Sequence, residues 1–75
     1  MTPKMPVVSA KDLIRVLEIY GYECVRQRGS HIRLLHPTLP PITVPDYKEI
    51  RVGLLAKILR DAHIDADDLI RHIQH

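Results

Sequence analysis

The stretch RQRGSHIRLLHP, residues 26–37, carries three arginines and two histidines around a Gly-Ser pair, with no acidic residue. Gly29 and Ser30 suit the two central positions of a type II′ hairpin turn, in which glycine occupies the first. A two-residue turn determines which residues of the flanking strands lie opposite each other. We therefore predict an antiparallel hairpin at the centre of the fold.

The predicted register brings like charges together. It makes four pairs: Arg28 with His31, Gln27 with Ile32, Arg26 with Arg33, and Val25 with Leu34. Side chains alternate between the two faces of a strand, so the basic ones share a face. These are Arg26, Arg28, His31 and Arg33, while Val25, Ile32 and Leu34 point toward a core. Two opposed arginines are unfavourable, and an anion over that face would relieve their repulsion.

A helix is predicted before the hairpin. Ser9 and Asp12 resemble a capping box in which aspartate replaces glutamate, and Gly21 supplies a left-handed stop. Apolar residues follow at helical spacing: Leu13, Val16, Leu17 and Tyr20. We expect this helix to run from about Ala10 to Tyr20.

After the hairpin, ITVP (42–45) predicts a short third strand. A second helix is indicated by apolar residues at helical spacing: Val52, Leu55, Ile58, Leu59 and Ala62. Asp65 and Asp68 then resemble the start of a short third helix. We therefore predict one α+β two-layer domain over residues 1–75, with a flexible segment at 1–8. The helices should cover one face of the three-stranded antiparallel sheet and leave the other open.

The composition is typical of a small globular domain, with 75 residues of which 45% are hydrophobic and 27% charged. No apolar run approaches the ~20 residues that cross a bilayer. MTPKMPVV has no apolar segment of useful length, so we expect no signal peptide. Cys24 is the sole cysteine, which excludes an internal disulfide and makes a cytoplasmic location the simplest expectation.

The charge distribution is more informative than the net charge of +2, because no carboxylate lies between Glu23 and Asp46. An acid-free basic tract can produce a local positive field. The same pattern also occurs on an ordinary solvated hairpin, so charge alone leaves both interpretations open.

His31 is the candidate for chemistry because of the arginines around it. An imidazole can take a proton from a ribose 2′-hydroxyl, whose oxygen then attacks the neighbouring phosphate. Arginines would hold that phosphate and offset the charge developing on its oxygens. Such a reaction needs no metal and no protein nucleophile, and it would cut RNA but not DNA. A histidine beside arginines is also common on a plain strand surface, so the residues alone do not decide for catalysis.

Other chemistries fit the sequence poorly. Five histidines are present, but no Cys or His pair has zinc-finger spacing, so we expect no metal and no other cofactor. A lone cysteine such as Cys24 is more typical of a packing residue than of a nucleophile. The three tyrosines are too few for a base-stacking platform.

Several short motifs, taken in order, resemble the HicA family, the RNA-cleaving toxins of bacterial and archaeal HicAB toxin–antitoxin pairs. The motifs are GSH after a basic strand, HP at the end of the next strand, TVP in the third strand and ILRDA in a helix. The similarity extends from VSAKDLIRVLEIYGYECVRQRGSHIRLLHP (8–37) through TVPDYKEIRVGLLAKILRDAHIDADDL (43–69).

This resemblance implies a fold like that of a double-stranded-RNA-binding domain and cleavage of mRNA that halts translation. The family's catalytic histidine corresponds to His31. We expect five further residues to contact RNA: Arg26, Arg28, Ser30, Arg33 and Lys48. For Ser30 the alternative is a role as the turn residue that follows glycine, and the hairpin turn favours that alternative. The implied partner is a HicB-type antitoxin that covers the active face, giving a hetero-oligomer, and no association with a membrane is expected.

Two positions depart from the family pattern. Tyr47 stands where the family often has histidine. The second helix of the family often begins with Gly-Thr-Leu, and Leu54 takes the place of that threonine. Leu54 lacks the hydroxyl that could cap the helix or meet a phosphate. Two alternatives therefore accompany the ribonuclease prediction: a non-catalytic RNA-binding module, and a degenerate toxin that only binds its antitoxin.

Overall fold

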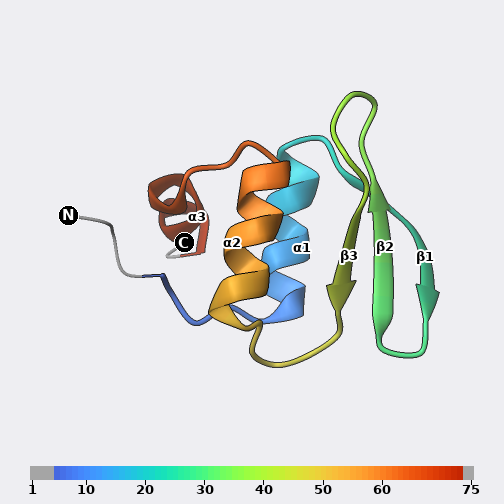
Figure 1. Ribbon diagram of the computed structural model, residues 1–75, viewed down its shortest axis with the longest axis horizontal. Coiled ribbons are helices and arrows are strands. Elements are labelled where there is room, and N and C mark those ends of the chain that lie inside the picture. The colour runs from blue at the N-terminus through green and yellow to red at the C-terminus, as the bar shows by residue number, and fades with distance from the viewer. Residues whose placement is uncertain (1–4, 74–75) are drawn as a thin grey trace.

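The computed structural model describes residues 5–73 and shows a helix, a three-stranded sheet and two further helices (Figure 1). The elements are α1 (Ala10–Ile19), β1 (Glu23–Arg28), β2 (His31–Leu35), β3 (Ile42–Pro45), α2 (Val52–Asp61) and α3 (Ala66–Ile73). The strands are antiparallel and lie in the order β1-β2-β3. This architecture confirms the predicted α+β fold class.

The helices cover one face of the sheet and leave the other to solvent. In Figure 1, α1 and α2 lie between the sheet and α3. Leu34 of β2 and Val44 of β3 are fully buried against them, whereas Leu35 and Thr43, their neighbours in the chain, are exposed. An antiparallel sheet with one solvated face shows this alternation. Any site built on the sheet must therefore lie on the open face.

The apolar stripe predicted for the second helix is largely confirmed. Leu55, Ile58, Leu59 and Ala62 are buried in the core. Val52 is 58% exposed, so its predicted place in that stripe is wrong. It is the first residue of α2 and lies outside the packed core.

Most of the predicted hairpin register is confirmed. Arg28 pairs with His31, Gln27 with Ile32, and Arg26 with Arg33. Gly29 has a φ of 54°, as the first central position of a type II′ turn requires.

The outer end of that register is wrong, because a β-bulge between Cys24 and Arg26 shifts the pairing by one residue. Cys24, instead of Val25, lies opposite Leu34, and Val25 is 48% exposed instead of packing into the core. Bulges are common in edge strands, where they increase the twist and interrupt the ladder. Strict alternation along the sequence does not show such an insertion.

Helix α1 begins and ends at the predicted signals. The Ser9 hydroxyl accepts a hydrogen bond from the Asp12 amide at 3.1 Å. At the other end, the amides of Gly21 and Tyr22 donate to the carbonyls of Glu18 and Leu17 at 3.1 and 3.0 Å, a Schellman motif. Gly21 has a φ of 102°, and a Cβ there would lie 2.9 Å from His36 Nε2. Glycine is therefore required for two independent reasons.

Helix α2 ends with the same motif but without glycine. The amides of His63 and Ile64 donate to the carbonyls of Arg60 and Leu59 at 3.2 and 2.9 Å. His63 has a φ of 56°, the one positive value at a non-glycine among residues 5–73. A side chain in this left-handed conformation is strained, because its Cβ approaches the following carbonyl oxygen.

His36 joins the end of β2 to the end of α1. Its Nδ1 accepts hydrogen bonds from the amides of Thr38 and Leu39 at 3.1 and 3.2 Å. Its Nε2 must then carry the proton, which it donates to the Tyr20 carbonyl at 3.1 Å. Tyr22 packs against this ring with a centroid separation of 4.9 Å. Both ring nitrogens are thus used for structure.

The predicted flexible segment 1–8 is described only in part, since residues 1–4 lie outside the described region. Val8, at its end, is 1% exposed, and its carbonyl accepts a hydrogen bond from the Ile50 amide at 2.7 Å. The following segment is joined to the same loop, because the Ala10 amide donates to the Tyr47 carbonyl at 2.9 Å. Val8 therefore belongs to the core.

The two Schellman motifs predict opposite effects of substitution. His63→Gly should stabilise the fold by about 0.5–1 kcal/mol, because glycine adopts a positive φ without the steric cost of a Cβ. Gly21→Ala should destabilise it by at least about 1 kcal/mol, since both the φ and the contact with His36 are unfavourable. Urea denaturation measures both. A loss of stability in His63→Gly would contradict the strain assigned to His63.

Candidate functional site

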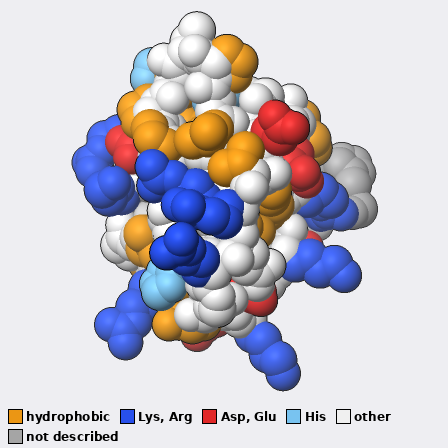
Figure 2. All heavy atoms as spheres, turned by 90° about the vertical axis from the view of Figure 1, so that its right-hand side faces the viewer, with side chains coloured by type: hydrophobic (Ala, Val, Ile, Leu, Met, Phe, Trp, Pro, Cys, Tyr) orange, Lys and Arg blue, Asp and Glu red, His pale blue; other side chains and the backbone are white. Residues whose placement is uncertain are grey.

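The open face of the sheet contains a pocket of about 140 Å³ that all three strands line. Its side chains are those of Arg26, Arg28, His31, Arg33 and Thr43. Figure 2, which views the molecule from the side of the sheet, shows basic side chains gathered here with a histidine beside them. The four residues that strand alternation predicted on one face therefore do lie together.

The strand register arranges these side chains in two rows across the sheet. Arg26, Arg33 and Thr43 lie opposite one another in the first row. Arg28, His31 and Pro45 form the second row. The rows are two residues apart, which is about 7 Å along a strand. A phosphate bound by the first row would lie next to the imidazole of His31 in the second.

The pocket is strongly positive. Within residues 5–73, the ion pairs all lie on helices away from it: Arg15 with Asp12, Lys57 with Asp61, and Arg71 with Asp68. Arg26 and Arg33 are direct neighbours across β1 and β2, and like charges in that position repel. Guanidinium groups bind phosphate oxygens through charge-assisted hydrogen bonds. An anion in this pocket would therefore relieve an unfavourable interaction and gain a favourable one.

Thr43 is a pocket residue that the sequence analysis missed. Its hydroxyl accepts a hydrogen bond from Nη1 of Arg33 at 3.1 Å. It is exposed on β3 between the buried residues Ile42 and Val44, so it faces the open side of the sheet. The signal was present in the alternation of the TVP motif, but it could not be used before the pairing of β3 with β2 was known.

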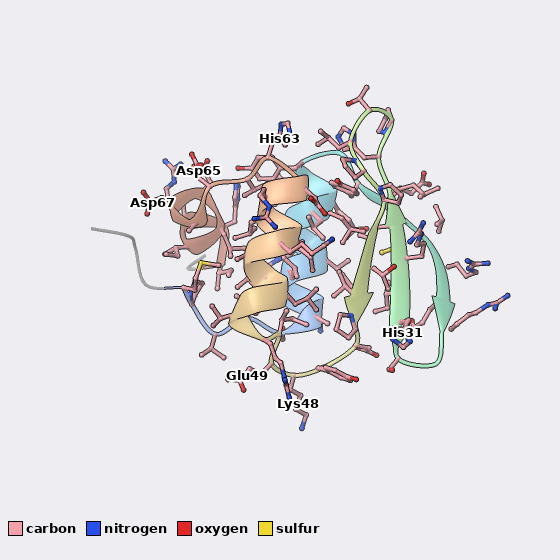
Figure 3. The ribbon with its side chains drawn as sticks, viewed as in Figure 1. His31, Lys48, Glu49, His63, Asp65 and Asp67 are labelled. Atoms are coloured by element: carbon pink, nitrogen blue, oxygen red, sulfur yellow. The ribbon has the colours of Figure 1, made fainter. Side chains whose placement is uncertain are left out.

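Ser30 and Lys48, which the sequence analysis placed at the RNA, do not line this pocket. Ser30 is half-buried in the hairpin turn, where its carbonyl accepts a hydrogen bond from the Asp46 amide at 2.6 Å. Lys48 is exposed in the loop between β3 and α2, and Figure 3 shows it well apart from His31. The bond from Asp46 joins that loop to the hairpin turn.

The surroundings of Cys24 disfavour its thiolate form. Partial burial of its sulfur raises the pKa of the thiol, and the Glu18 carboxylate raises it further. The residue as a whole remains exposed on β1. Because the thiolate is the reactive form, a raised pKa disfavours nucleophilic chemistry at this position.

Residues 5–73 hold no group of three or more His, Cys, Asp or Glu side chains placed to bind a metal ion. Over the same residues, no helix is long and apolar enough to cross a membrane.

Comparison with known proteins gives one family match. The model of a family described as the HicA toxin of bacterial toxin–antitoxin systems matches residues 10–64. This span contains α1, the whole sheet and α2, and it includes every residue that lines the pocket. Among curated proteins, no sequence matches the chain.

The repulsion between Arg26 and Arg33 should lower the free energy of unfolding when no anion is bound. Arg26→Gln should raise the free energy of unfolding by a few tenths of a kcal/mol, up to about 1 kcal/mol, in low-salt buffer without phosphate. The gain should shrink in high salt, which screens exposed charges. Urea denaturation at two salt concentrations measures this change.

Arg28→Gln is the matched control, because it removes the same charge from the same strand at a position opposite His31. An equal gain in both variants would contradict the pairwise repulsion and indicate an effect of net charge alone.

Proposed function

Because the chain belongs to the HicA toxin family of bacterial toxin–antitoxin systems, we propose that it is an endoribonuclease that cleaves mRNA and thereby halts translation. The observation that supports this proposal is the shared pocket of His31 and three arginines with no ion-pair partner among the described residues. mRNA as substrate places the protein in the cytoplasm. The reaction requires no metal ion and no other cofactor.

In the proposed reaction, His31 acts as the general base. Its imidazole takes the proton of a ribose 2′-hydroxyl, and the 2′-oxygen forms a bond to the adjacent phosphorus. The bond from phosphorus to the 5′-oxygen breaks, and that oxygen takes a proton from water and leaves as a 5′-hydroxyl. Arg26, Arg28 and Arg33 bind the phosphate and offset the negative charge that develops on it. The products are a 2′,3′-cyclic phosphate and a 5′-hydroxyl end.

In this proposal Ser30 and Lys48 contact RNA outside the pocket. Lys48 contacts the RNA backbone beyond the scissile phosphate, since its loop is joined to the hairpin turn through the bond between Asp46 and Ser30. Such a contact adds affinity without sequence preference. Ser30 contacts RNA at the tip of the hairpin, next to His31 in the chain.

The test is an RNA cleavage assay with purified protein free of antitoxin, in EDTA. His31→Ala should cut about 10²–10⁴-fold more slowly than wild type, the range that a positioned general base contributes. His63→Asn is the matched control and should cut normally, because Figure 3 shows His63 above α2, well apart from His31 at the lower end of the sheet. The products should carry cyclic phosphate ends, and a DNA strand of the same sequence should remain intact.

The two sources of failure are distinguishable. Cleavage by His31→Ala at the wild-type rate would contradict the role of His31. Intact RNA with folded wild-type protein would contradict the enzyme itself and favour a module that only binds RNA or the antitoxin. A folding check by circular dichroism applies to every variant.

The family also implies an antitoxin partner. We propose that a HicB-type antitoxin forms a hetero-oligomer with this chain and covers the basic pocket. Unneutralised arginines on an open sheet face suit an acidic partner surface, and a partner seated there would exclude the substrate.

The antitoxin proposal predicts that the complex does not cleave RNA. Arg26→Gln and Arg28→Gln together should weaken antitoxin binding, measured by calorimetry at fixed salt, by roughly tenfold. Arg60→Gln with Lys57→Gln, on α2 away from the sheet, is the control of equal charge change. Equal weakening in both double variants would contradict a contact at the pocket.

A further inference from the structure

The pocket contains a polar contact that the proposed reaction does not yet use. Among the described residues, the bond from Arg33 Nη1 to Thr43 Oγ1 is the hydrogen bond that joins two side chains of the pocket lining. The two residues lie directly opposite each other on β2 and β3. On its other side, Arg33 lies opposite Arg26. Arg33 is thus attracted to Thr43 on one side and repelled by Arg26 on the other.

The position of Arg33 depends on this balance. A free arginine side chain carries about 2 kcal/mol of rotamer entropy, and repulsion from Arg26 favours rotamers that turn away from the pocket. The Thr43 hydroxyl holds one end of the guanidinium group by a single hydrogen bond. A guanidinium group has five N–H donors, so four remain for a ligand. Thr43 thus engages one donor of Arg33 and leaves four for a ligand.

The threonine hydroxyl is not needed for packing. Thr43 is exposed, and valine, which has the same shape and favours strands at least as well, would serve the fold equally. The hydrogen bond that this hydroxyl makes among the described residues is the one from Arg33, which lines the pocket. The hydroxyl therefore points to a role for Thr43 in the site.

We propose that Thr43 is a positioning residue, which holds Arg33 in the first row of the pocket so that Arg26 and Arg33 together bind one phosphodiester group of RNA. His31, in the second row, then lies beside the ribose that carries the attacking hydroxyl. This inference rests on the proposed ribonuclease function. It adds a residue to the site and assigns the first row to the scissile phosphate.

Binding to an uncleavable RNA tests the inference separately from catalysis. A short oligonucleotide with 2′-O-methyl riboses keeps its phosphates but lacks the hydroxyl that the reaction requires. Its affinity is measured by fluorescence anisotropy at one fixed salt concentration, because phosphate contacts depend strongly on salt. The proteins are wild type, Thr43→Val, Thr43→Ser, Arg33→Gln and the double variant of Arg33→Gln with Thr43→Val.

We expect Thr43→Val to weaken binding roughly three- to tenfold, the effect of losing one hydrogen bond of ordinary strength. Thr43→Ser should restore affinity, since serine keeps the hydroxyl. In the Arg33→Gln background, Thr43→Val should have no further effect, because a residue that acts through Arg33 has nothing left to position. Urea denaturation should give similar midpoints for valine and serine at position 43, which excludes a loss of folding.

Two results would overturn the inference. Wild-type affinity in Thr43→Val would show that the hydroxyl does not matter to binding. An equal loss with and without Arg33 would show that Thr43 acts on the RNA by itself. Failure of the ribonuclease proposal has a separate signature, namely folded wild-type protein that binds this oligonucleotide but leaves ordinary RNA intact.

Discussion

The site depends on the register of the hairpin formed by β1 and β2. The turn at Gly29 places Arg26 directly opposite Arg33 and Arg28 opposite His31, so four basic side chains share the solvated face. A slip of one residue in either strand would turn its side chains to the other face and disperse the cluster. Burial of Leu34 at 0% exposure opposes such a slip, since its side chain would move from the core into water. Core packing therefore stabilises the arrangement of charges.

The two histidines of this hairpin differ in the hydrogen bonds that their rings make. His36 uses both ring nitrogens, with backbone amides on Nδ1 and the Tyr20 carbonyl on Nε2. His31 is exposed in the pocket, and none of the described hydrogen bonds involves its ring. It is therefore the histidine of this hairpin whose ring is open to a ligand.

The bulge in β1 lies where it leaves the pocket undisturbed. It comes between Cys24 and Arg26, beyond the two rows that line the pocket. It also interrupts the outer edge of the sheet, as proteins commonly do to prevent strands of other chains from pairing there. One consequence reaches the open face: Glu23 now lies opposite Leu35 and shares the side of the arginines. Glu23 and Leu35 form the row next to that of Arg26 and Arg33, about 7 Å along the strands.

Local signals in the sequence determined most of the fold. A hydroxyl cap at Ser9, a glycine stop at Gly21, the Gly-Ser turn and the bounds of the third strand are all decided within a few residues, and the structure confirms each. The same periodicity placed the four basic side chains on one face. Tertiary structure decided what depends on distant partners: the bulge that exposes Val25, the pairing that brings Thr43 to Arg33, and the separation of Lys48 from the pocket. Periodicity describes one strand at a time, whereas these features arise from how a strand meets its neighbour.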